Sequence, residues 1–211
     1  MELVEKYKYY RKRSKELNQK MIEKCITRRL LEEAGKYLGI LRKDTLIFTY
    51  EEEVNVLMDF ALHEIKTNGK NAVQNYKDMF GGEDDVEREI LEAFISSYTS
   101  LFKIVDIFKE EFAILIKDVF ANRKLKLMDI GFSQTASKNL LLFIRVTPFQ
   151  EFNTTSGIAF VFEGELIGYL LHRYKIFMKK IKEGSESMKR FLCFYRLNKR
   201  FGIDVYYRDV K

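Results

Sequence analysis

The chain has 211 residues, of which 46% are hydrophobic and 32% charged, with one proline and a net charge of +6. This composition predicts a globular protein and excludes long disordered linkers. The longest apolar runs fall far short of the roughly 20 residues that span a bilayer, and the charged first residues do not form a signal peptide. Because the only two cysteines, Cys25 and Cys193, form no cluster, we expect a cytoplasmic protein with reduced thiols.

Helical spacing predominates in the first hundred residues. Thr27 is predicted to cap a helix that stops near Gly39. Thr49 and Glu52 are predicted to form a capping box at the start of a helix that continues to Asn68. Further helices are predicted at residues 2–24, around 70–79, and from Gly81-Gly82 to about 97.

Near Tyr98 the apolar spacing becomes strand-like, and it stays so for about sixty residues. Five or six short antiparallel strands in that space would close most economically into a small barrel, because an open sheet leaves edges unpaired. Helices are then predicted from Glu165 to Lys182 and after Gly184-Ser185, with a last strand at 203–207. The predicted strands are residues 101–108, 111–117, 124–129, 140–146 and 158–162.

These elements predict an α+β protein with N-terminal helices, a small antiparallel barrel-like module and a C-terminal helical pair. Residues 1–97 are expected to form a helical region, and residues 98–162 the β-module. Residues 163–211 are expected to be basic helices that pack on the N-terminal region.

The order of several residues between 38 and 162 is similar to that of a module in an uncharacterised prokaryotic protein family. Some members of that family carry a separate cysteine-rich SEC-C zinc motif, which this chain lacks, so the resemblance implies no zinc site here. It implies a helical segment followed by a β-module, and no activity. The residues that carry it are Leu91, Tyr98, Ser100-Leu101-Phe102, Lys117-Asp118, Asp129, Phe132-Ser133-Gln134-Thr135, Leu142, Arg145, Pro148-Phe149 and Ser156-Gly157.

Charge is sorted along the chain. Residues 1–30 carry ten Lys and Arg against four Asp and Glu, and residues 170–211 carry twelve against four. The stretch 31–169 has 15 basic and 23 acidic residues, so the three net charges are +6, −8 and +8. If the two ends fold against each other, they make one positive face that attracts phosphates or an acidic protein.

Metal binding and catalysis find little support in the sequence. Asp59 and His63, one turn apart on the helix that begins near Glu52, are the weak candidates for metal ligands. We expect them to lie on a solvated polar face and to bind no metal, because partners at ligand spacing are missing. No nucleophile elbow or phosphate-binding glycine loop occurs, so we expect binding without cofactors rather than catalysis. A metal-dependent enzyme remains the third alternative.

Nucleic acid, RNA or DNA, is the first partner expected. Basic residues recur at helical spacing near the C-terminus, where they can follow a phosphate backbone without sequence preference. The alternatives are a solvated lysine-rich surface and a protein-protein scaffold. In the β-module, Phe143, Arg145 and Pro148-Phe149 form either a binding rim or, as alternating strand positions more often do, part of the barrel interior. Lys124 and Lys126 in the β-module are expected to contribute much less. The candidate nucleic-acid ligands are Lys175, Lys179, Lys182, Lys189, Arg196 and Arg200, with Tyr9, Tyr10, Tyr195, Tyr206 and Tyr207 as stacking groups.

Overall fold

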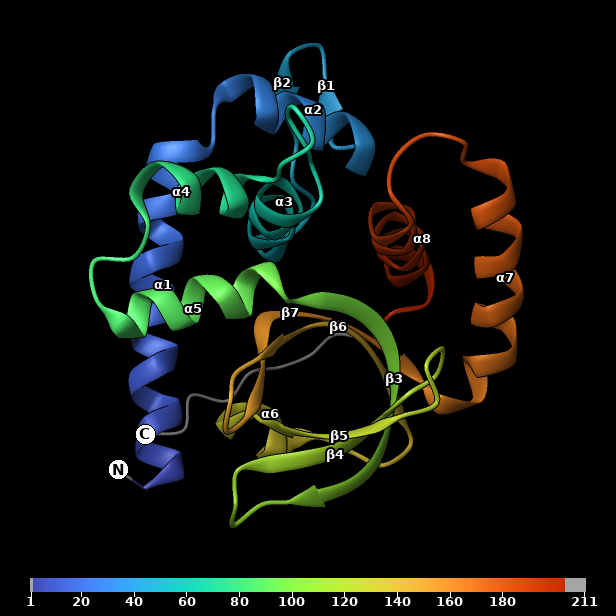
Figure 1. The fold of residues 1–211 in the computed structure, drawn as a ribbon. Helices are drawn as coiled ribbons and strands as arrows, with labels where there is room; N and C mark the ends of the chain where they lie inside the picture. Colours follow the sequence, from blue (N-terminus) through green and yellow to red (C-terminus); the bar gives the residue numbers. More distant parts are fainter. Residues whose placement is uncertain (1, 204–211) are drawn as a thin grey trace. The chain divides into compact units, whose positions relative to one another are not determined.

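The computed structural model describes residues 2–203, and its helices and strands make an α+β protein, as the sequence predicts. The described chain divides into two compact units (Figure 1). We call residues 8–96 the helical unit, and residues 2–7 together with 97–203 the barrel unit. The structure groups the strands that follow residue 97 and both C-terminal helices in the barrel unit. Packing of those helices on the N-terminal region stays a prediction.

Short polar caps set the ends of the helices in the helical unit. The Thr27 hydroxyl accepts the backbone N–H of Leu30 at 3.2 Å, which confirms the predicted cap. Gly39 ends the same helix with φ +76°, a left-handed conformation that favours glycine. The elements are α1 (Leu3–Cys25), α2 (Arg28–Leu38), β1 (Leu41–Arg42), β2 (Thr45–Leu46), α3 (Glu52–His63), α4 (Ala72–Phe80) and α5 (Asp85–Ile95).

The capping box lies one helix later than predicted. The backbone N–H of Thr49 donates to the Glu53 carboxylate rather than to Glu52, and α3 already ends at His63. The full capping box belongs to α4, where Asn71 and Gln74 accept each other's backbone N–H groups. The predicted capping box at Thr49 and Glu52 is therefore wrong, and the box at Asn71 and Gln74 was not predicted.

Five strands of the barrel unit pair in the order β3-β4-β5-β7-β6, and β6 returns to β3. Strands β5 and β7 are joined by a single parallel residue pair, Leu127 with Asn153, so the barrel is only partly closed between them. A short helix, α6 (Ile130–Thr135), lies between the third and fourth strands. This strand order, with one short helix between the third and fourth strands, resembles the arrangement of the OB-fold, a five-stranded Greek-key barrel. The strands are β3 (Tyr98–Phe108), β4 (Ala113–Asp118), β5 (Lys124–Met128), β6 (Leu140–Pro148) and β7 (Asn153–Glu163).

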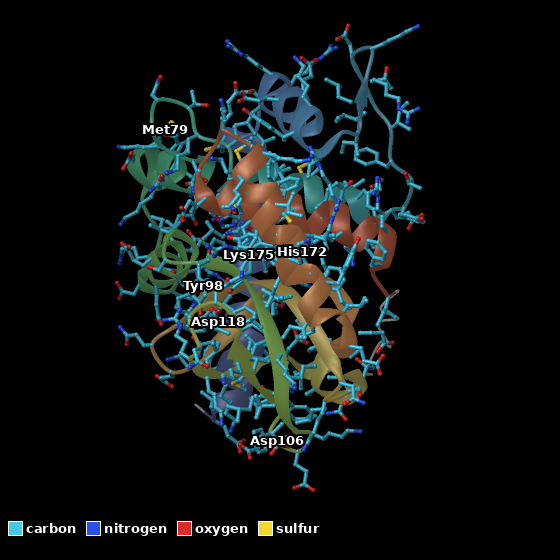
Figure 2. All side chains as sticks on the ribbon, turned by 90° about the vertical axis from the view of Figure 1, so that its right-hand side faces the viewer. Met79, Tyr98, Asp106, Asp118, His172 and Lys175 are labelled. Atoms are coloured by element: carbon cyan, nitrogen blue, oxygen red, sulfur yellow. The ribbon has the colours of Figure 1, made fainter. Side chains whose placement is uncertain are left out.

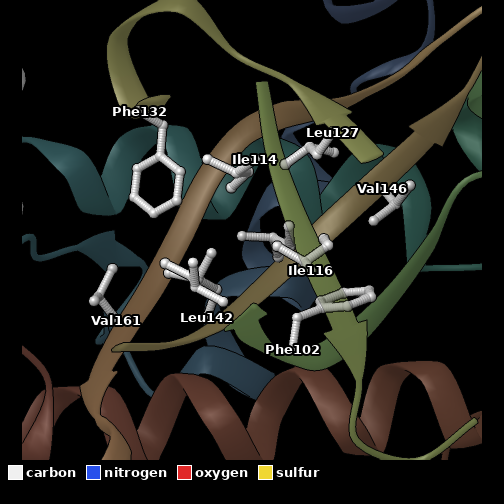
Figure 3. Packing of buried hydrophobic residues seen from close by; sticks show 10 residues of the cluster. Phe102, Ile114, Ile116, Leu127, Phe132, Leu142, Val146 and Val161 are labelled. Carbon is white, nitrogen blue, oxygen red and sulfur yellow. The ribbon is translucent and has the colours of Figure 1, made fainter. Parts of the chain in front are cut away.

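The barrel interior is filled by alternate residues of the strands (Figure 3). Phe102, Ile116 and Leu142 are each fully buried there, as the two-residue period of a strand requires. Phe132 of α6, which the sequence analysis did not predict as a helix, closes one end of this core. The residues between these inward positions lie on the outer surface of the barrel.

The outer surface of β6 and β7 is covered by α8 (Glu186–Phe201), and α7 (Ile167–Lys180) packs on α8. Phe143 of β6 is stacked on Phe194 of α8 with ring centroids 4.6 Å apart. Phe143 and Arg145 are buried, so the predicted binding rim at these residues is wrong. They lie under a helix rather than at an edge. Of the predicted strand at 203–207, residues 204–207 lie outside the described part of the chain.

Candidate nucleic-acid interface

The α7–α8 segment contains more cationic than acidic residues. Residues 167–200 contain ten Lys and Arg against two Asp and Glu. On α7, Leu170 is fully buried, whereas His172, Lys175 and Lys179 recur at helical spacing on the opposite side and are exposed (Figure 2). The predicted α7 row is therefore a solvent-facing row.

The remaining predicted cations, Lys182 and those of α8, do not continue the α7 row in the way that helical spacing predicted. Lys182 lies beyond the end of α7, in the turn between the helices, and the ammonium group of Lys189 donates to its carbonyl oxygen at 3.3 Å. The guanidinium of Arg196 lies 5.2 Å from the ring centroid of Phe177 on α7. Arg200 is exposed in the last turn of α8. We call the six residues, Lys175, Lys179, Lys182, Lys189, Arg196 and Arg200, the helix surface.

Most cations of the helix surface have no internal counter-charge. Within residues 2–203, Lys175, Lys179, Lys182 and Arg200 have no carboxylate oxygen within 4.0 Å. Some lysines of the same unit do have one, such as Lys126, which pairs with Glu111. In the described part of the chain, no carboxylate contact therefore offsets the charges of these four side chains.

Arg190 differs from these residues because its guanidinium is used inside the unit. It donates to the Thr99 carbonyl at 2.9 Å and to the Tyr174 hydroxyl at 3.4 Å, and it lies 5.3 Å from the centre of the Phe120 ring. Arg190 thereby connects α8 to β3 and to the β4–β5 turn. We assign it a structural role rather than a ligand-binding one.

Two of the three predicted stacking tyrosines that the structure describes are buried. Tyr10 is 6% exposed and donates to Glu89 at 2.6 Å, and Tyr195 is 3% exposed. Tyr9 is exposed, and Tyr206 and Tyr207 lie outside the described residues. Tyr10 and Tyr195 occupy apolar positions of their helices, so burial of their rings outweighs any role at the surface.

A different aromatic pair lies exposed beside the helix surface. Tyr169 of α7 and Phe201 of α8 have ring centroids 5.1 Å apart and exposed fractions of 42% and 37%. Phe201 directly follows Arg200. The sequence analysis missed this pair, because residues 32 positions apart come together only when α7 and α8 pack antiparallel to each other.

The basic N-terminal segment uses part of its charge within the helical unit. Arg13 lies 2.7 Å from Asp84 and 3.2 Å from Glu87, and Lys20 lies 2.8 Å from both Glu83 and Glu87. Burial acts to raise the pKa of Glu87, but hydrogen bonds from Lys20 and from the Glu83 backbone, with the charges of Lys20 and Arg13, hold that pKa below its usual value. The basic end and the acidic middle of the chain thus neutralise each other here.

The weak metal candidates do not lie on a solvated face. Asp59 is 7% exposed and His63 is half-buried with its ring 6.1 Å from that of Phe94. The expectation of a solvated polar face is therefore wrong for Asp59. Among the described residues, no three His, Cys, Asp or Glu side chains are grouped so that they could hold a metal ion.

Both cysteines are free thiols with a high pKa. Burial raises the pKa of Cys193 to about 12, against the opposing effect of Arg173 and Arg196, and burial also raises the pKa of Cys25. A thiol becomes a nucleophile only as the thiolate. At neutral pH the geometry therefore supports packing rather than thiol chemistry.

Comparison with known proteins gives a family but no activity. No curated protein and no solved structure matches the chain significantly. Within residues 2–203, every helix is too short or too polar to cross a membrane. A family model with the description "Family of unknown function (DUF7986)" matches residues 1–208, and the chain therefore belongs to this family.

Proposed function

We propose that this protein binds single-stranded RNA or DNA without sequence preference, through the helix surface of the barrel unit. The observation that carries the proposal is the combination of cations that lack carboxylate partners with an exposed aromatic pair. A cationic track follows the sugar-phosphate backbone, and exposed rings stack on unpaired bases of any type. This pairing of features favours a single strand over a duplex, whose bases are already stacked.

The proposal is tested by the salt dependence of binding to a fluorescent oligothymidylate and to its RNA counterpart. Each phosphate contact releases counterions, so the logarithm of affinity should fall with the logarithm of salt at about −0.7 per contact. In the double variant Lys175→Gln/Lys179→Gln the slope should fall by about 1.4 units. Its affinity at 0.1 M salt should fall by about 25-fold.

The matched control is the double variant Lys36→Gln/Lys66→Gln, in the helical unit. These lysines are exposed, lack carboxylate partners among the described residues, and their replacement changes the net charge equally. The control should bind like the wild type. A wild-type protein that is not retained on single strands at low salt, or a control that loses as much affinity as the helix variant, would refute the proposal.

The protein-protein alternative rests on a different surface. Ile47, Tyr50 and Val54, around the start of α3, have exposed fractions of 46%, 62% and 38%. Apolar contacts respond weakly to salt, whereas phosphate contacts respond steeply. A partner captured from solution whose affinity is unchanged between low and high salt would favour this scaffold function.

A further inference from the structure

Three lysines stand opposite one another on three neighbouring strands of the barrel. Lys103 of β3 is the cross-strand partner of Lys117 of β4, and Lys117 is in turn the partner of Lys124 of β5. Their strand neighbours, such as Phe102 and Ile116, point into the core, so the three lysines point outward. We call Lys103, Lys117 and Lys124 the lysine ladder.

The lysine ladder is electrostatically unfavourable in the isolated protein. Directly opposed side chains have Cβ atoms about 5 Å apart, and like charges at that distance destabilise a sheet. Among the described residues none of the three has a carboxylate oxygen within 4.0 Å. The next outward lysine on β5, Lys126, is neutralised by Glu111. The fold thus accumulates three cations in one row and supplies no counter-charge for them.

The surroundings of the lysine ladder leave it open to solvent. Lys103 and Lys124 are exposed and Lys117 is partly exposed. The outer surface of β6 and β7, in contrast, bears Phe143, Phe160 and Phe162 and is covered by α8. One side of the barrel is therefore a packing surface for a helix, and the other is a cationic surface.

We propose that the lysine ladder binds consecutive phosphates of a single-stranded nucleic acid, which assigns Lys124 a larger part than the sequence led us to expect. With strands about 5 Å apart, the row is about 10 Å long, comparable to two or three nucleotides of one strand. The strands β4 and β5 are the second and third of the barrel, and in OB-folds this face binds oligonucleotides. That likeness is one of fold and adds to the charge argument without replacing it.

This inference rests on the proposed function and extends its track. In Figure 2, the strand β3, between Tyr98 and Asp106, and the helix α7, with His172 and Lys175, lie on the same side of the barrel unit. One nucleic-acid strand could contact the helix surface with one part and the lysine ladder with another. Affinities measured for oligonucleotides of different lengths therefore distinguish binding at one site from binding at both.

The test compares the wild type with the triple variant Lys103→Gln/Lys117→Gln/Lys124→Gln on oligothymidylates of increasing length. The variant should lose about fivefold in affinity per lysine at 0.1 M salt, or about 100-fold in total, and about 2 units of salt slope. It should also stop gaining affinity at a shorter length than the wild type. The charge control Lys36→Gln/Lys66→Gln should match the wild type.

Four outcomes distinguish this inference from the proposed function. If the wild type binds, the helix variant is weakened and the ladder variant is not, the lysine ladder is no ligand site and only this inference fails. If both variants are weakened and the length dependence changes only in the ladder variant, both ideas stand. If the wild type binds no oligonucleotide, the proposed function fails and the inference with it. If the wild type binds heparin but no oligonucleotide, the ligand is an anionic polysaccharide, which also overturns both.

Discussion

The two basic ends of the chain use their charge in opposite ways. On α1, Arg13 and Lys20 lie against the acidic start of α5, and the ammonium group of Lys6 pairs with Glu151. On α7, Lys175 and Lys179 extend into solvent with no carboxylate near them among the described residues. The first end stabilises a fold, and the second remains available to a ligand.

The difference teaches that the charge of a segment does not measure the charge that a partner can reach. Residues 1–30 and 170–211 have similar net charges, +6 and +8. When a cation is paired with an internal carboxylate, the two charges largely cancel. The electric field that a distant partner experiences is then small. The variants below remove either paired or unpaired charges, and the expected changes in stability are given from the largest to the smallest.

The largest effect is expected when the paired cations are removed. In Arg13→Ala/Lys20→Ala, the carboxylate of Glu87, which is 2% exposed, would keep its buried position without a cationic partner. Breaking a fully buried pair destabilises a protein strongly. Because Arg13 and Lys20 are partly exposed and solvent screens their charges, the loss should be smaller than for a fully buried pair, and still the largest among these variants. Denaturant unfolding measures the loss, with Lys36→Ala/Lys66→Ala as a control expected to stay within about 0.5 kcal/mol. Equal stability of the two double variants would contradict the pairing.

A smaller effect is expected from Glu87→Gln and from acid. The amide keeps the shape but loses charge-assisted hydrogen bonds, which contribute about 1.5–3 kcal/mol at neutral pH. Because the folded-state pKa values of Asp84 and Glu87 are lowered, their contribution is complete above the unfolded values of about 4 and is lost as pH falls through the folded values. Unfolding free energies measured from pH 7 to pH 2 should therefore fall less steeply in Glu87→Gln. Parallel curves for variant and wild type would contradict the assignment.

The lysine ladder predicts a substitution that stabilises the protein. Lys117→Gln removes the central charge of three, so at low salt the unfolding free energy should rise by about 0.5 kcal/mol and Tm by about 1–2 °C. High salt should abolish the gain, since it screens exposed charges. Lys126→Gln, on the neighbouring strand, removes a charge that Glu111 already neutralises and should give no gain. A gain of the same size in both variants would show that the repulsion is not specific to the ladder.

The smallest effect on stability is expected at the helix surface. Lys175→Gln/Lys179→Gln removes two exposed side chains without partners, so the unfolding free energy should stay within about 0.5 kcal/mol of the wild type. Thermal unfolding of the same samples used for binding checks this. A loss of several kcal/mol would mean that these lysines support the fold, and a loss of binding could then not be ascribed to ligand contacts.

Local signals in the sequence predicted the elements well. The cap at Thr27 and the breaks at Gly81-Gly82 and Gly184-Ser185 lie where the structure has them. The change of period near Tyr98 marks the start of β3. These features depend on neighbours within a few residues, so a single sequence contains the information. The short helix α6 escaped because six residues carry too little periodicity.

The candidate site was predicted less completely. Lys175, Lys179 and Arg200 are exposed, as a helical period implies, but Tyr10 and Tyr195 are buried and the exposed pair is Tyr169 with Phe201. Which aromatic ring is exposed depends on what packs over it from a distant segment. A helical wheel orders residues around one axis and does not say which other element covers them.

By itself the sequence determined the α+β class, the positions of most helices and strands, and the placing of basic residues near both ends. Only the tertiary structure decided which of those charges meet a carboxylate and which stand opposite one another. The lysine ladder shows the reason: the hydrogen-bond register between strands sets Lys103, Lys117 and Lys124 in one row, and a shift of one residue would turn Lys117 into the core. Register is a property of paired strands, and no single segment of the chain contains it.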